Sequence, residues 1–215
     1  MFNILCYGDS NTYGHVPETG GRYPRSVRWP GVLQELLGPE YYVIEEGLCG
    51  RTTMFDDPDD PCRNGLEYLE ASLLSHQPLD LVILFLGSND TKYSFNASAE
   101  LITEGLSRLC GVIRGMEWKA DFREPRILIV APPAIGAHAG SFFPDFDESS
   151  VKKAEQLAPL YKKTADEYGA LFIDASLCAH AGADDLHLDR ESHRRLAEEL
   201  KKIILPLNGF TLPEL

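Results

Sequence analysis

The sequence has no surplus of positive charge and no long hydrophobic run. Its 215 residues include 20 lysines and arginines but 33 aspartates and glutamates, which gives a formal net charge of −13 at pH 7. Such a chain repels nucleic acids and anionic membrane surfaces unless a local basic patch compensates, and the sequence contains no such patch. The longest mostly apolar run, residues 79–86, is far too short to span a bilayer. We therefore expect neither a nucleic acid nor a membrane as a partner.

Paired cysteines and cofactor motifs are also missing. The five cysteines are odd in number and widely scattered, and they form neither a Cys-x-x-Cys pair nor a zinc pattern. Such a pattern is typical of reduced thiols, and strand-like sequence begins at residue 2, which leaves no room for a signal peptide. No Walker loop or dinucleotide fingerprint is present. We expect a cytoplasmic protein with no cofactor.

The length and composition suit one globular domain. A domain of 215 residues buries roughly 70% of the surface of its unfolded chain, and 44% of these residues are hydrophobic. No internal repeat, low-complexity tract or Gly/Ser linker divides the chain. We predict a single domain over residues 1–205 and a C-terminal tail over 206–215.

Apolar, β-branched-rich runs alternate with segments of helical spacing. The predicted strands are residues 2–7, 42–45, 81–86, 126–130 and 170–174. The predicted helices are residues 32–37, 66–74, 101–113, 151–168 and 196–204. This alternation predicts an α/β fold: a doubly wound, three-layer α/β/α sandwich around a mostly parallel five-stranded sheet. Two long irregular stretches, 47–65 and 132–149, are candidates for functional loops.

Polar residues follow four of the five predicted strands. These segments are Gly8-Asp9-Ser10-Asn11, residues 47–53, Gly87-Ser88-Asn89-Asp90 and residues 183–187. Because ligands bind at the carboxyl ends of parallel strands, we expect the four segments to meet at one edge of the sheet. Each segment alone has a purely structural interpretation: Ser10 could cap the first helix, and Asp184 could start a helix that carries a surface histidine.

Together, these segments meet the requirements for acyl transfer through a serine. Ser10 is the candidate nucleophile, His187 the general base and Asp184 the acid that orients the base. The backbone N–H groups of Ser10 and Gly50, with the side-chain amide of Asn89, are candidates for the oxyanion hole. An asparagine supplies a donor whose charge does not change with pH.

The base must be selected from six histidines. Only His187 has an acid three residues before it and a place beyond the last strand. His15 lies five residues from Ser10, and we expect it in a loop or in the pocket wall. We expect His193 on the exposed side of the last helix.

The same segments resemble, in order, the consensus blocks of the serine hydrolases called the GDSL or SGNH superfamily. The blocks are Gly8-Asp9-Ser10, the segment with Gly50, Gly87-x-Asn89-Asp90 and Asp184-x-x-His187. Further segments are similar to the bacterial arylesterase/acyltransferase branch: Val27-Arg28-Trp29, residues 43–48, Arg51-Thr52-Thr53, Asp56-Asp57-Pro58 and residues 79–83 leading to Asn89-Asp90-Thr91-Lys92. The resemblance covers residues 3–204.

This resemblance implies a small-molecule ester substrate, hydrolysed through an acyl-enzyme. Members of the branch act on short-chain and aryl esters, some transfer acyl groups to alcohols or peroxide instead of water, and some are octamers, so we expect a homo-oligomer. Asn11 and Tyr13 depart from the leucine and tryptophan common in the branch, and we expect both to contact substrate. A carbohydrate O-deacetylase or a thioesterase with the same triad is an alternative.

Two other classes of site are weaker candidates. A flavodoxin-like module could cradle a phosphate or flavin on residues 10–12, but it would leave Asn89, Asp184 and His187 without a role. The acidic residues 56–60 and 184–185 invite a metal, but they lack calcium-loop glycines and a second histidine at ligand spacing. We expect a solvated acidic loop and no metal.

Overall fold

The fold is known from a computed structural model, which describes residues 1–209. Its centre is a sheet of five parallel strands in the order β2-β1-β3-β4-β5. The strands are β1 (Phe2–Gly8), β2 (Tyr41–Gly47), β3 (Leu81–Phe85), β4 (Arg126–Ala131) and β5 (Leu171–Asp174). The predicted fold class is confirmed, and every strand pair is parallel.

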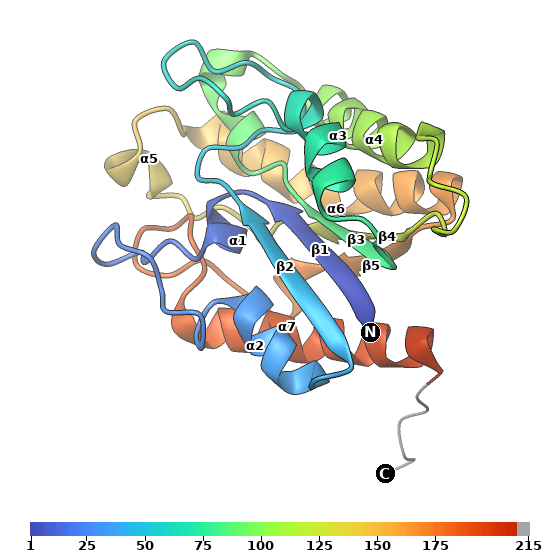
Figure 1. Cartoon of the computed structure of the whole chain (residues 1–215). Coiled ribbons are helices and arrows are strands. Elements are labelled where there is room, and N and C mark those ends of the chain that lie inside the picture. Colours follow the sequence, from blue (N-terminus) through green and yellow to red (C-terminus); the bar gives the residue numbers. More distant parts are fainter. Residues whose placement is uncertain (210–215) are drawn as a thin grey trace.

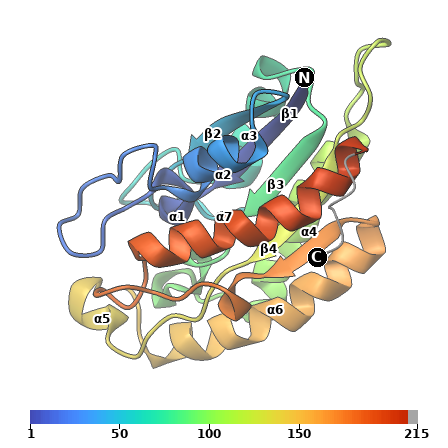
Figure 2. The ribbon, with the colours of Figure 1, turned by 90° about the horizontal axis from the view of Figure 1, so that it is seen from below.

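Helices cover both faces of the sheet (Figures 1 and 2). On one face lie α2 (Trp29–Leu37) and α7 (Arg190–Ile204), which pack against each other and against one set of strand side chains. On the other lie α3 (Gly65–Ser75), α4 (Ala99–Gly115) and α6 (Glu148–Tyr168). Side chains alternate along β1, so that Ile4 and Cys6 join the first core and Leu5 and Tyr7 join the second.

The observed helices are longer than the hydrophobic pattern predicts because polar caps extend them beyond their apolar residues. Asp147 begins α6 with a capping box that involves Ser150, and Gly169 ends it in the left-handed conformation. Asp189 caps α7 by accepting a hydrogen bond from the backbone of Ser192. Caps satisfy backbone groups that a helix end leaves free, and apolar periodicity does not register them.

Short elements complete the chain at the carboxyl edge of the sheet and between the long helices. They are α1 (Ser10–Tyr13), α5 (Ala139–Phe142), η1 (Asn89–Thr91), η2 (Tyr93–Phe95), η3 (Ala175–Leu177) and η4 (Leu205–Asn208). The predicted tail begins inside η4, and residues 210–215 lie outside the described part. No helix in residues 1–209 is both long enough and apolar enough to cross a membrane.

The carboxyl ends of β1 and β2 are joined by a buried arginine. The guanidinium of Arg51 donates to the backbone carbonyls of Gly8 and Glu46 and lies 4.1 Å from the centre of the Tyr7 ring. Only 5% of Arg51 is exposed. A charge removed from water to this degree needs such partners, so Arg51 fixes the strand ends that carry the polar segments.

The prediction that His193 lies on the exposed side of the last helix is wrong. It is fully buried on the inner face of α7, where its Nδ1 accepts a hydrogen bond of 3.2 Å from the backbone N–H of Trp29. Burial lowers the pKa of His193 to about 3. The polar side chain is accepted in the core because it stays neutral and satisfies the otherwise free N–H at the start of α2.

This neutral histidine predicts a loss of stability in acid. The unfolded chain binds a proton at this side chain below its ordinary pKa of about 6.5, whereas the folded chain does not, so stability falls as the pH drops below that value. The maximum slope is about 1.4 kcal/mol per pH unit. His193→Asn retains an acceptor for Trp29, and between pH 6.5 and 4.5 it should lose about 2 kcal/mol less than the wild type in urea unfolding.

The exposed His138 supplies the control, because its side chain has no ion-pair partner among the residues that the structure describes, and His138→Asn should follow the wild-type stability profile. Parallel profiles for wild type and His193→Asn would contradict a neutral, buried His193.

Candidate active site

The nucleophile candidate opens a short helix that another side chain caps. Asp9 is the N-cap of α1, and its Oδ1 accepts a 2.9 Å hydrogen bond from the backbone N–H of Asn11. Ser10 is therefore the first helical residue and not the cap, which removes its purely structural interpretation. Gly47, at the end of β2, lies directly against α1, where a Cβ atom would come within 2.2 Å of the Tyr13 nitrogen.

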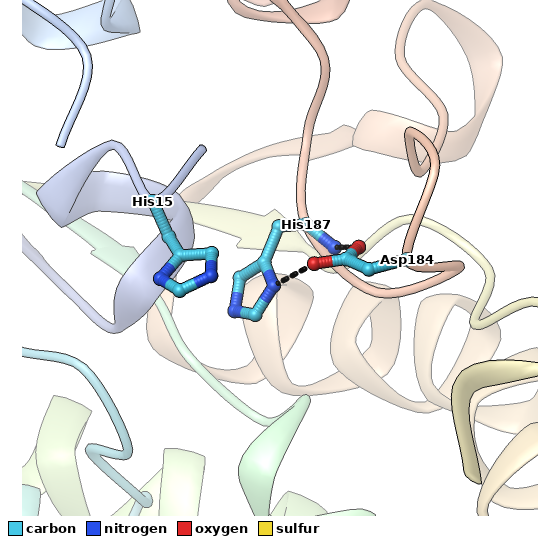
Figure 3. A group of neighbouring side chains, drawn as sticks. All are labelled: His15, Asp184 and His187. Atoms are coloured by element: carbon cyan, nitrogen blue, oxygen red, sulfur yellow. Dashed lines mark hydrogen bonds and ion pairs between the residues drawn. The ribbon is translucent and has the colours of Figure 1, made fainter. Parts of the chain in front are cut away.

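Ser10, His187 and Asp184 form one chain of hydrogen bonds. His187 Nε2 lies 2.9 Å from Ser10 Oγ, and His187 Nδ1 lies 2.6 Å from Asp184 Oδ2. The other carboxylate oxygen of Asp184 accepts from the backbone N–H groups of Leu186 and His187, at 3.0 and 2.8 Å. Figure 3 shows the carboxylate of Asp184 beside the ring of His187. The loop before α7 thus fixes the side chains of Asp184 and His187 relative to each other.

The bonds that orient Asp184 also keep it ionised. Burial acts to raise the pKa of this carboxyl group, but hydrogen bonds from the side chain and backbone of His187 and from the backbone of Leu186 outweigh it, so the pKa is lowered. An ionised carboxylate accepts the Nδ1 proton and leaves Nε2 free to accept a proton from Ser10.

The three predicted oxyanion donors meet beside Ser10. Ser10, Gly50 and Asn89 line the same cavity. Within residues 1–209, the backbone N–H groups of Ser10 and Gly50 have no hydrogen-bond acceptor. The amide nitrogen of Asn89 donates to the backbone carbonyl of Arg51 at 3.1 Å, which fixes the side chain, and it reaches Asp9 Oδ2 only at 3.5 Å. Gly50 has φ of +79°, a conformation that favours glycine.

Two buried carboxyl groups lie beneath these donors. Burial raises the pKa of Asp9 to about 7 and that of Asp90 to about 6. Asp90 Oδ1 accepts from the backbone N–H of Thr53 at 2.8 Å and from the Thr53 hydroxyl, which ties the loop after β2 to the loop after β3. Asp9 Oδ2 lies 3.5 Å from the Asn89 amide nitrogen.

The cavity over Ser10 is small and mostly apolar. Its volume is about 280 Å³. It is lined by Ser10, His15, Cys49, Gly50, Asn89, Lys92, Phe143, Pro144, Asp145, Phe146, Leu186 and His187. Both predicted functional loops contribute, since Cys49 and Gly50 belong to the first and Phe143 to Phe146 belong to the second. Lys92 pairs with Asp57 at 3.1 Å, so part of the acidic loop is an ion-pair partner and is not simply solvated.

Comparison with known proteins gives a consistent family. The model of the GDSL-like Lipase/Acylhydrolase family matches residues 6–195. A carbohydrate acetylesterase family member from Sinorhizobium meliloti is 39% identical with a TM-score of 0.92, over 98% of this chain and 100% of that one. The native aryl esterase of M. smegmatis is 37% identical with a TM-score of 0.91, over 96% and 100%. Est24, a carbohydrate acetylesterase from Sinorhizobium meliloti, is 36% identical with a TM-score of 0.90 over the same shares.

The chain belongs to the GDSL-like lipase/acylhydrolase family. It is a carboxylic ester hydrolase of the SGNH type, and its substrates are small-molecule esters. No curated protein matches the chain. Family membership argues against the flavin- or phosphate-binding module, and the length of α1, four residues, agrees.

The structure does not place the two expected substrate contacts in the cavity of the hydrolase. The side chain of Asn11 is buried, and its Oδ1 accepts a 2.9 Å hydrogen bond from the backbone N–H of Leu188. The ring of Tyr13 lies under the guanidinium of Arg22, at 4.1 Å. Both residues follow Ser10 on α1, and of the residues of this helix only Ser10 lines the cavity.

Two cavity residues of the hydrolase contact His187 directly. The ring centroids of His15 and His187 lie 3.9 Å apart. His15 lines the cavity, in agreement with its predicted place in the pocket wall. Phe143 meets the His187 ring edge-on at 5.3 Å. Phe143 was not predicted, because it lies in a long loop whose sequence has no periodic pattern.

His15, Asp184 and His187 also have the donor types of a metal site. Their nitrogen and oxygen ligand atoms lie within 4.8 Å of one another (Figure 3). However, the Asp184 and His187 atoms already bond each other, and His187 Nε2 bonds Ser10. An ion at His187 Nε2 would have to displace the Ser10 hydroxyl, so the arrangement fits proton transfer better than metal binding.

Proposed function

We propose that the protein is a serine esterase that hydrolyses short-chain or aryl carboxylic esters through an acyl-enzyme. The observation that carries this proposal is the continuous hydrogen-bond chain from Ser10 Oγ through His187 to Asp184 at the wall of a cavity. Serine hydroxyls become nucleophilic when an oriented imidazole accepts their proton.

In the proposed reaction, Ser10 Oγ attacks the ester carbonyl while its proton passes to His187 Nε2. The Nδ1–H of His187 remains bonded to Asp184, which stabilises the imidazolium. The N–H groups of Ser10 and Gly50 stabilise the negative oxygen, together with the amide N–H of Asn89 that otherwise makes the long 3.5 Å hydrogen bond to Asp9. His187 then donates its proton to the departing alkoxide, and an alcohol leaves. Water, deprotonated by His187, attacks the acyl-enzyme, and the carboxylic acid leaves as His187 returns the proton to Ser10 Oγ.

The cavity supports a small acyl group. A volume of about 280 Å³ with apolar walls from Phe143, Phe146 and Leu186 accepts an acetyl group readily and long chains poorly. Two of the similar structures are described as carbohydrate acetylesterases and one as an aryl esterase. Deacetylation of a carbohydrate is therefore the second candidate, with the same residues in the same roles.

The proposal extends to the acyl acceptor and to assembly. Transfer of the acyl group to an alcohol or peroxide, and a homo-oligomer, are implied by the resemblance to the arylesterase/acyltransferase branch.

Acyl-chain length provides the first test. With p-nitrophenyl esters, kcat/KM should be highest for acetate and fall as the acyl chain grows, because the cavity is small. Ser10→Ala should lose this activity, together with the mass adduct that a fluorophosphonate probe forms on the wild type. Acetylated xylose measured beside the aryl acetate distinguishes the two candidate functions. An active Ser10→Ala variant would refute the nucleophile.

Asn89→Ala tests the oxyanion hole. Removing one such donor typically lowers kcat by about 10²–10³-fold, because the donor acts mainly in the transition state. KM for p-nitrophenyl acetate should change far less. Asn89→Asp has the same shape without the donor, and it should be at least as slow. Thermal unfolding shows whether both variants fold, and wild-type kcat in a folded Asn89→Ala variant would exclude this role.

Asp184→Asn tests the orienting acid, with its neighbour as a matched control. The amide would present a donor or a neutral acceptor to Nδ1, and we expect kcat to fall on the order of 10³-fold or more. Asp185 accepts a hydrogen bond from the backbone N–H of His138 and does not line the cavity. Asp185→Asn should therefore stay within about twofold of wild type. If kcat of Asp184→Asn were as close to the wild-type value as kcat of Asp185→Asn, another group would have to orient His187.

A further inference from the structure

His15 is the closest aromatic neighbour of the candidate base. The two imidazole rings have centroids 3.9 Å apart and planes inclined by 32°, which is a tilted stack (Figure 3). The closest aromatic contact of His187 from the loop after β4 is Phe143, at 5.3 Å and nearly perpendicular. The ring of His187 is thus covered on one face by His15 and approached by the edge-on Phe143, while its nitrogens face Asp184 and Ser10.

The backbone around His15 is built to return this side chain to the nucleophile. Gly14 ends α1 in the left-handed conformation, with φ of +86°. The backbone N–H of His15 then donates a 3.0 Å hydrogen bond to the carbonyl of Ser10, and an antiparallel bridge to Arg22 holds the next part of the chain. The position of His15 is therefore fixed relative to Ser10 itself.

We propose that His15 is a positioning residue of this hydrolase, which holds the ring of His187 by stacking so that Nε2 stays aligned with Ser10. This inference rests on the proposed function, because it assigns His187 the role of base. Without His15, the His187 ring keeps its bond to Asp184 but loses the contact that limits rotation of Nε2 away from Ser10. An aromatic pair contributes enough to change the aligned fraction about 3- to 10-fold.

The same contact links catalysis to the charge of His15. Burial, and then the nearby His187, lower the pKa of His15. The charged or titratable groups facing it are His187 and Asp184, and Lys92 and Asp145 line the same cavity. A protonated His15 would place a second positive charge against His187 as that ring takes the Ser10 proton. A positive charge on His15 would therefore oppose the proton transfer from Ser10.

Two substitutions separate stacking from charge. His15→Ala removes the ring, and kcat for p-nitrophenyl acetate should fall about 3- to 10-fold, with a smaller change in KM. His15→Phe keeps a stacking ring without nitrogen, and kcat should return to within about twofold of wild type. His180→Ala, which removes an exposed histidine outside the cavity, should have wild-type kcat.

The hydrogen bond between His187 and Asp184 gives a readout that a loss of packing alone would not change. Its low-field proton resonance should broaden in His15→Ala and stay sharp in His15→Phe.

The proposal is overturned by any of three results. These are a wild-type kcat in His15→Ala, an effect confined to KM, or a His15→Phe variant as slow as His15→Ala. The failure of the proposed function is distinguishable, since it would show as a wild type without fluorophosphonate adduct on Ser10. Adduct formation together with unaffected His15 variants would refute only the positioning role.

Discussion

The hydrogen bond between Ser10 and His187 joins two residues that are 177 positions apart, and the rest of the site depends on it. A bond of 2.9 Å requires that α1 and the loop before α7 be held close together. A second contact over the same separation does this, because Asn11 accepts a hydrogen bond from the backbone of Leu188. Asn11 therefore holds the loop before α7 against α1 beside Ser10.

Beneath this contact, the polar residues of the carboxyl edge form a buried layer that is satisfied mainly by backbone groups. Arg51 donates to the carbonyls at the ends of β1 and β2, and Asp90 accepts from Thr53. Asn89 is held in turn by the carbonyl of Arg51. Such a layer rigidifies the donors that surround Ser10, since each bond in a low-dielectric interior is costly to break.

The helical layers pack on the two faces of the sheet and leave its carboxyl edge to the loops. The helices α2 and α7 pack on one face, and α3, α4 and α6 pack on the other, so the central strands β1, β3 and β4 are mostly buried. The loops at the carboxyl edge are free to differ in sequence without disturbing either core. In the loop after β4, for example, the ring of Phe143 contacts the ring of His187.

Much of the fold was predictable from local pattern. The five apolar runs became the five strands because strands covered on both faces need continuous apolar sequence, and their alternation with helical spacing leads to a parallel sheet. The positions of Ser10, Gly50, Asn89 and His187 at one edge followed from the same rule, because the carboxyl ends of parallel strands face the same way.

By itself, the sequence determined the succession of strands and helices along the chain and which chemical groups lie at the carboxyl edge of the sheet. Both depend on periodicity and spacing along the chain. Only the tertiary structure decided where individual side chains point. His193 faces the core because α2 presents a free N–H to it, and Asn11 faces Leu188 because the last loop passes behind α1. His15 stacks on His187 because Gly14 reverses the chain. These three orientations arise from contacts between segments far apart in sequence or from a backbone reversal. The spacing of apolar residues does not predict either of these.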